Sequence, residues 1–137
     1  MNIEQHVTSL ELSKRLKELG VQRESAFYWA KWTGEPPCVC YTGGGYTGVM
    51  QCSAFLASEL GEMLPKEHHE LGHLQLWKRS DIMAGNQYAW TAEYHNNGGI
   101  SAMCDGTLPN AMAQLLIHLI EQGIVDPNLI TKQEPKV

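Results

Sequence analysis

The chain has 137 residues, of which 43% are hydrophobic and 18% are charged, and its formal net charge is −5. This length suits one domain and is short for two, and the composition is that of a globular chain rather than a disordered one. The negative charge and the lack of any Lys/Arg run disfavour nucleic-acid binding. The charged N-terminus and the lack of a long apolar run disfavour a signal peptide and a membrane span. We therefore expect a cytoplasmic protein whose cysteines are reduced thiols.

The first predicted helix covers residues 9–19. Thr8 and Glu11 have the spacing of a capping box, with Thr8 as the N-cap. Leucines at helical spacing then form one apolar stripe. Gly20 is placed to end the helix in a left-handed conformation, and Val21 is placed to pack back onto the stripe in a Schellman motif.

Short β-prone runs and a second helix follow. The aromatic segment "SAFYWAKW" (25–32) predicts a strand. In "CVCYTGGGYTGVMQC" (38–52), β-prone runs flank three glycines, which predicts a hairpin or a long irregular turn. The second helix is expected over about residues 54–64, with Ser53 as its N-cap and Pro65 at its end.

Two further strands are predicted in the C-terminal half. "HLQLWKRS" (73–80) and "QYAWTAEY" (87–94) both alternate between apolar and polar residues. The segment "MAGN" is typical of a turn between them, and "HNNGG" closes the second strand.

The last helix is expected to begin near Pro109, a residue favoured in the first helical turn. Leu108 or Thr107 precedes it at the start. Apolar residues then recur at i, i+3, i+4, i+7 and i+8, and Gly123 ends the run.

The predicted order is α, β, β-hairpin, α, β, β, α. An antiparallel sheet packed with about three helices, an α+β fold, accounts for that order best. We expect a single domain over residues 1–126, and residues 127–137 as a flexible C-terminal tail.

Three segments resemble a family of small uncharacterised proteins encoded by bacteriophages and bacterial prophages. They are the Leu-rich first helix ending in Leu-Gly, in "TSLELSKRLKELGVQRESAFYW", the helix ending in Leu-Pro, in "SAFLASELGEMLP", and the Leu-rich last helix, "AMAQLLIHLIEQG". The resemblance spans most of the chain and implies a phage origin and an α+β fold. It implies no activity, cofactor or catalytic residue.

The segment "EHHELGHLQLW" contains His69, Glu70 and His73 in the H-E-x-x-H pattern of zinc metallopeptidases. In such enzymes the two histidines lie one helical turn apart and bind one zinc ion, and the glutamate activates the metal-bound water. A third protein ligand completes the site. Glu93 or His95, about twenty residues further along the chain, is the candidate for that ligand.

The surroundings of this motif lack the expected scaffold. Pro65 stops the preceding helix, Gly72 lies inside the motif, and the leucines after it continue with period two. The extended metzincin pattern is missing, because Leu76 and Arg79 stand where Gly and His are needed. We therefore interpret residues 67–75 as a solvated connection that runs into a strand.

The segment from Gly43 to Gly48 is also a formal G-x-G-x-x-G pattern. A dinucleotide-binding turn requires a helix directly after the third glycine and an acidic residue at a later strand end. Neither is predicted here, so we interpret the glycines as part of a hairpin.

The four cysteines are spaced irregularly, whereas structural zinc sites usually use C-x2-C pairs. A four-thiolate site is the alternative to buried reduced cysteines that act as small hydrophobic residues, and we expect the latter. The four are Cys38, Cys40, Cys52 and Cys104.

Aromatic residues gather on the predicted strands, where core packing explains most of them. Strand alternation leaves some on the opposite face, where they can form a protein-binding patch or a dimer contact. The set comprises Phe27, Tyr28, Trp29, Trp32, Trp77, Tyr88, Trp90 and Tyr94.

No serine or cysteine has a nucleophile elbow or a local triad signature. We therefore expect a non-enzymatic phage or prophage accessory protein that binds a protein partner or a second copy of itself in the bacterial cytoplasm, without a cofactor. The alternative is a zinc-dependent hydrolase with His69 and His73 as ligands, Glu70 as the base, and Glu93 or His95 as the third ligand.

Overall fold

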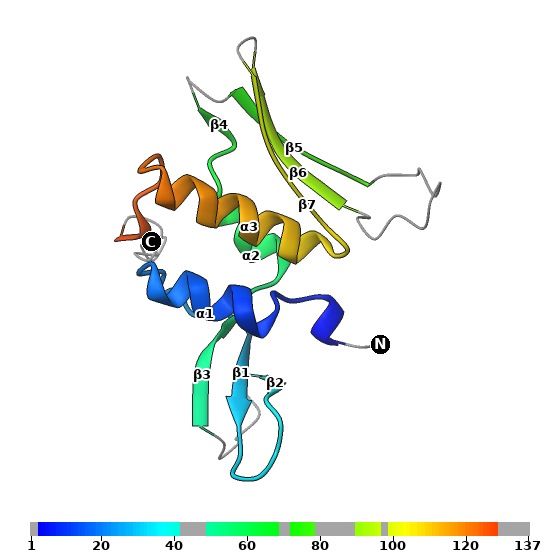
Figure 1. Ribbon diagram of the computed structural model, residues 1–137, viewed down its shortest axis with the longest axis vertical. Helices are drawn as coiled ribbons and strands as arrows, with labels where there is room; N and C mark the ends of the chain where they lie inside the picture. Colours follow the sequence, from blue (N-terminus) through cyan, green and yellow to red (C-terminus); the bar gives the residue numbers. More distant parts are fainter. Residues whose placement is uncertain (1–2, 42–48, 69–71, 79–89, 97–98, 129–137) are drawn as a thin grey trace, which may run out of the picture.

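A computed structural model describes residues 3–41, 49–68, 72–78, 90–96 and 99–128. In chain order the elements are η1 (Ile3–Gln5), α1 (Leu10–Glu18), β1 (Phe27–Lys31), β2 (Cys38–Tyr41), β3 (Val49–Ala54), α2 (Ala57–Met63), β4 (Glu67–His68), β5 (Gly72–Lys78), β6 (Trp90–Asn96), β7 (Gly99–Asp105) and α3 (Leu108–Glu121) (Figure 1). Within these ranges the strands form two antiparallel sheets. The predicted α+β class is confirmed.

Helix α3 lies at the centre of the molecule. It packs against β6 and β7 on one side and against α1 and α2 on the other, while the sheet of β1, β2 and β3 projects from the far side of α1 (Figure 1). Eight of its 14 residues are buried, because a helix enclosed on several sides must be apolar around most of its circumference. The main core therefore forms where α3 meets its neighbours.

Helix α1 begins one residue later than its capping box predicts. Ser9, and not Thr8, is the N-cap, and its hydroxyl accepts the N–H of Leu12 at 3.2 Å. Thr8 is fully buried instead, where its Oγ1 accepts the N–H of Phe55 at 3.0 Å and lies 2.6 Å from the Oγ of Ser13. The prediction of Thr8 as the N-cap is wrong because its hydroxyl is used for a tertiary contact.

The predicted C-terminal ends of α1 and α3, and the predicted start of α3, are confirmed. Gly20 has a φ of 101°, and the N–H of Val21 donates to the C=O of Leu16 at 3.0 Å, as a Schellman motif requires. At the end of α3, Gly123 has a φ of 76°. At its start, Thr107 is the N-cap.

The first sheet has the strand order β2-β1-β3, and both outer strands run antiparallel to β1. Of the two alternatives predicted for residues 38–52, the hairpin is wrong, because β2 and β3 each pair with β1 and not with each other. The alternative of a long irregular turn concerns mainly residues 42–48, which the structure does not describe. Residues 42–48, which carry the G-x-G-x-x-G pattern, lie outside the described residues. The β1–β3 register shifts between Trp29 and Ala30, which leaves Gln51 without a register partner.

Helix α2 begins at Ala57, later than expected. The predicted N-cap, Ser53, belongs to β3, because the pairing of β3 with β1 continues as far as Ala54, opposite Phe27. The expected end of this helix is confirmed, since Pro65 directly follows the C-cap residue, Leu64.

The start of α2 is tied to β1 by the carboxylate of Glu59. This carboxylate accepts the hydroxyl of Ser25, the N–H of Ala26 at 3.1 Å and the N–H of Leu56 at 2.8 Å. It therefore satisfies a backbone donor at the helix N-terminus and another at the entrance to β1.

We expect Glu59→Ala to lower the free energy of unfolding by about 1.5–2.5 kcal/mol, because two backbone donors lose a charged acceptor. Urea denaturation measures the change. Glu18→Ala is the control, since the Glu18 side chain is 69% exposed and forms an ion pair with Arg15 at the surface, where such a pair is worth less than about 1 kcal/mol. Equal losses of unfolding free energy in Glu59→Ala and Glu18→Ala would contradict a stabilising link between α2 and β1 through Glu59.

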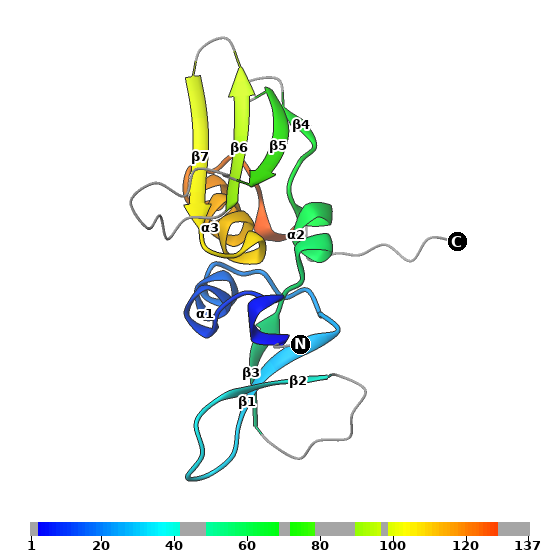
Figure 2. The same ribbon diagram turned by 90° about the vertical axis from the view of Figure 1, so that its right-hand side faces the viewer.

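The second sheet has the order β4-β5-β6-β7 with all pairs antiparallel (Figure 2). Strands β5 and β6 confirm the two strands predicted in this half, whereas β7 and the two-residue β4 were not predicted. Ala92 and Tyr94 of β6 are fully buried on the side of α3. Their register partners on β5, Leu76 and Leu74, share that face. Trp77 therefore points to the opposite, outer face.

Candidate functional site

The described part of the H-E-x-x-H motif lies in strands. Glu67–His68 form β4, and His73 lies in β5, where it is the register partner of Glu67. Gly72 has a φ of 89°, which is incompatible with an α-helix at that point. His69 and Glu70 lie outside the described residues. The prediction that the chain here runs into a strand is confirmed for residues 72–78. The connection expected over residues 67–75 is wrong for 67–68 and 72–75, which pair with each other or with β6 as parts of β4 and β5.

The candidate third ligands lie on β6. His95 is the register partner of His73, and Glu93 is the partner of Gln75. The carboxylate of Glu93 accepts the indole N–H of Trp77 at 3.0 Å. Within the ranges that the structure describes, no three His, Cys, Asp or Glu side chains form a group that could hold a metal ion.

The cysteines divide between different parts of the fold. Cys38 and Cys40 lie on one face of the first sheet, in a cluster with Tyr28. Cys52 lies in a separate cluster with Trp29, its register partner on β1. Among the cysteine side chains that the structure describes, Cys38 and Cys40 are therefore neighbours, whereas Cys52 lies apart from them. All three of these cysteines are free thiols, and the backbone of the fourth lies in β7 of the other sheet.

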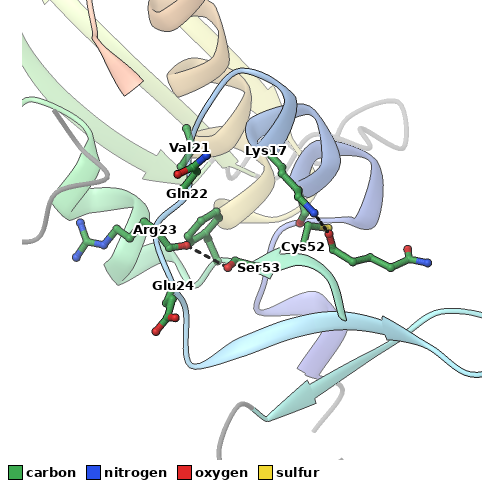
Figure 3. Close-up of a pocket in the computed structure, with 10 residues that line it drawn as sticks. Lys17, Val21, Gln22, Arg23, Glu24, Cys52 and Ser53 are labelled. Atoms are coloured by element: carbon green, nitrogen blue, oxygen red, sulfur yellow. Dashed lines mark hydrogen bonds between the residues drawn. The ribbon is translucent and has the colours of Figure 1, made fainter. Parts of the chain in front are cut away.

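A cavity of about 450 Å³ lies between α1, β3 and the segment that leads from α1 to β1 (Figure 3). The ammonium of Lys17 donates to the C=O of Gln51 at 2.7 Å, and the hydroxyl of Ser53 donates to the C=O of Arg23 at 3.0 Å. Arg23 also forms an ion pair with Glu62. Much of the polar lining is thus already engaged within the protein.

Cys52 is the cysteine that lines this cavity, and its thiolate form would be a nucleophile. Burial raises the pKa of its thiol, and the nearby ammonium groups of Lys17 and Lys14 lower it by less. A thiol that keeps its proton near neutral pH is a poor nucleophile. Gln51 Oε1 is buried and accepts no hydrogen bond in the described part of the chain. The cavity has volume for a small molecule but lacks an activated nucleophile among its lining residues.

Strand β5 carries two of the large exposed apolar side chains of the described residues. Leu76 is 41% exposed on the helix side of the sheet, and Trp77 is 43% exposed on the outer side. Contacts between α3 and the sheet are concentrated on β6 and β7, so α3 does not cover β5 to the same extent. The hydrogen bond to Glu93 holds the Trp77 indole across β6.

One edge of β5, beside these side chains, has little pairing with the other strands that the structure describes. Strand β4 pairs only with Gly72 and His73, and the N–H of Leu74 then donates to the C=O of Lys66 at 3.0 Å. Peptide groups two residues apart in a strand point to the same edge, so the N–H and C=O of Leu76 face this side as well. Among the strands that the structure describes, none pairs with the edge beyond Leu74.

The chain was compared with protein-family models, curated proteins and solved structures. No significant match was found. The resemblance to phage and prophage proteins therefore stays a prediction, and function has to be argued from the geometry. None of the helices in the described ranges has the length and apolar character that a membrane span requires.

The predicted aromatic set divides between the core and the surface, although the neighbours Tyr28 and Trp29 of β1 are both buried on opposite faces of their sheet, and Tyr88 lies outside the described residues. Tyr28, Trp29 and Tyr94 are buried, whereas Trp77 is exposed. The sequence did not identify Leu76 as a surface residue, because its place in the strand pattern is that of a core residue. The open edge beside it also gives no local sequence signal, since it depends on how short β4 is.

Proposed function

We propose that the protein is a non-enzymatic interaction module that binds an extended segment of a partner protein along β5. The observation that supports this role is the edge of β5 at Leu76, with which no strand of the described residues pairs and which the exposed side chains of Leu76 and Trp77 flank. An added strand would extend the second sheet and take up the free backbone groups.

The two kinds of contact have different roles. Backbone hydrogen bonds along the edge contribute affinity for any extended segment, whereas side chains on alternating faces select its sequence. Leu76 and Trp77 lie on opposite faces of the sheet, so the preferred segment carries apolar residues on both of its faces.

Trp77 is the expected anchor of this contact. Buried tryptophans are among the residues that contribute most to protein interfaces. The hydrogen bond from its indole to Glu93 restricts the side chain before the partner arrives. Less rotamer entropy is then lost on binding.

The zinc hydrolase is the weaker candidate. Its chemistry needs two histidines one helical turn apart, whereas the described residues on either side of His69 and Glu70 lie in strands. We therefore propose no hydrolytic activity for this segment.

Site-specific photo-cross-linking in bacterial cells tests the interaction. A benzophenone amino acid replaces Gln75, an exposed neighbour on the same strand, and in a control chain it replaces Tyr41, a 56% exposed aromatic residue of the other sheet. We expect a discrete cross-linked partner from position 75 and none from position 41, after prophage induction or phage infection.

Two further variants in the position-75 chain test the mechanism. Trp77→Ala removes the anchor, and Leu76→Pro removes the outward N–H without removing a β5–β6 bond; each should reduce the cross-link at least about tenfold. Circular dichroism verifies that both variants fold. The same product from position 41, or an unchanged product in both variants, would contradict the proposal. A product of twice the mass of the chain would identify a second copy and overturn the proposal of a different partner.

A further inference from the structure

Two thiols lie side by side on the edge strand β2. The Sγ atoms of Cys38 and Cys40 are 3.8 Å apart, and both side chains point to the same face of the first sheet. Cys40 is buried and Cys38 is half-buried, so the pair is reached from one side.

The separation of the sulfur atoms matches that of two ligands of one metal ion. With metal–sulfur bonds of about 2.3 Å, two thiolates of a tetrahedral site lie about 3.8 Å apart. A disulfide would require a sulfur separation of about 2.05 Å and Cα atoms closer than about 6.8 Å. Residues i and i+2 of a strand are already about 6.6 Å apart, near that limit. The position of the two thiols on one strand therefore suits binding of one metal ion better than formation of a disulfide.

The surroundings of the pair favour a soft ion. The thiols pack with Tyr28, Ala30 and Trp32 in a hydrophobic cluster. An ordinary cysteine thiol has a pKa of about 8.5 and therefore carries its proton at neutral pH. An ion must therefore displace thiol protons, which thiophilic metals do and hard cations such as Mg²⁺ do not.

We propose that Cys38 and Cys40 form a dithiol site for a thiophilic d10 metal ion. On binding, each thiol releases its proton to solvent and each thiolate sulfur donates an electron pair to the ion, whose oxidation state does not change. Zinc sites usually have four ligands, and within the described residues this cluster supplies two. Cu(I), which soft thiolates favour, is therefore expected to bind more tightly than Zn(II).

Competition with a coloured Cu(I) chelator, bicinchoninate, tests the site on the full-length protein under anaerobic, reducing conditions. The wild type should withdraw about one equivalent of copper, which is seen as a loss of the chelator absorbance. Cys38→Ser and Cys40→Ser should each weaken the affinity about a hundredfold. Cys52→Ser is the matched control and should leave it unchanged, because Cys52 lies in a different cluster.

The pH dependence gives a second readout. Release of two protons predicts that affinity rises about a hundredfold per pH unit below the thiol pKa values. A parallel titration with Zn(II) and a zinc indicator should show weaker binding; tighter binding of Zn(II) than of Cu(I) would overturn the assignment of Cu(I) as the preferred ion. An equal loss of copper binding in Cys52→Ser and Cys38→Ser, or no withdrawal by the wild type, would overturn the site itself. Far-UV circular dichroism shows whether each serine variant keeps the fold.

Discussion

Replacing Thr8 with valine is expected to lower the free energy of unfolding by about 2–3 kcal/mol. The substitution keeps the size and branching of a fully buried side chain but removes its hydroxyl. The N–H of Phe55, itself buried, then loses its acceptor, and the hydroxyl of Ser13 loses a close partner. A buried donor without a partner costs more than the hydrogen bond itself contributes.

Urea denaturation of Thr8→Val measures this loss, and Thr107→Val provides a matched control. Thr107 is the N-cap of α3, and its hydroxyl accepts the N–H of Asn110 at 3.4 Å in a half-buried position. Loss of an N-cap costs about 1 kcal/mol. A loss for Thr8→Val no larger than that for Thr107→Val would show that Thr8 is not a buried link between α1 and the end of β3.

Local sequence signals predicted the C-terminal ends of α1 and α3 well. Gly20 and Gly123 both have the positive φ expected of residues that terminate helices. These predictions succeeded because a left-handed C-terminal residue is a local requirement, satisfied by glycine at low cost whatever the tertiary contacts are.

Predictions that depended on distant partners were less successful. Thr8 has the local pattern of an N-cap, yet its hydroxyl bonds to Phe55, which is far away in the sequence. Likewise, Ser53 resembles an N-cap but lies in β3, because pairing with β1 extends the strand. Capping preferences are worth about 1 kcal/mol, so tertiary contacts readily override them.

The strand β7 carried a usable signal. Asn97-Gly98 separates β6 from β7 by two residues, the sequence pattern most typical of a tight hairpin. We interpreted "HNNGG" only as the close of the second predicted strand, and predicted no strand after it. In contrast, no local sequence signal indicates the strand order β2-β1-β3. The sequence around the glycines is equally compatible with a hairpin between β2 and β3.

The candidate sites show the same division. The period-two pattern after Gly72 correctly predicted the strand β5. The two-residue spacing of Cys38 and Cys40 is a local feature that places both side chains on one face of β2. The open edge at Leu76, however, follows from the short pairing of β4, which is a property of the assembled sheet.

Tyr94 is expected to be among the residues whose loss most destabilises the protein. It is a large, fully buried side chain in the cluster between the second sheet and α3, and its hydroxyl donates to the C=O of Pro65. Tyr94→Ala removes this aromatic ring and leaves a cavity, at a cost of about 3–5 kcal/mol. Thermal and urea denaturation should both show the loss, and a cost below about 1 kcal/mol would contradict the central position of the ring.

The hydroxyl of Tyr94 also predicts a loss of stability at alkaline pH. Burial raises the pKa of this phenol well above its ordinary value, so the folded state keeps the proton. The unfolded chain loses it above about pH 10, which favours unfolding. The contribution of Tyr94 is therefore complete below pH 10 and falls by up to about 1.4 kcal/mol per pH unit above it.

Tyr94→Phe separates this effect from packing, because it keeps the ring and removes the ionisable group. The buried thiols of Cys40 and Cys52, whose pKa values are also raised, contribute to alkaline unfolding in the wild type and in the variant alike. The difference between the two pH profiles thus isolates the phenol. Tyr41→Phe, at an exposed position, is the control and should retain the wild-type slope. If the slope of Tyr94→Phe above about pH 10 equals that of the wild type, the phenol does not stay protonated in the folded state.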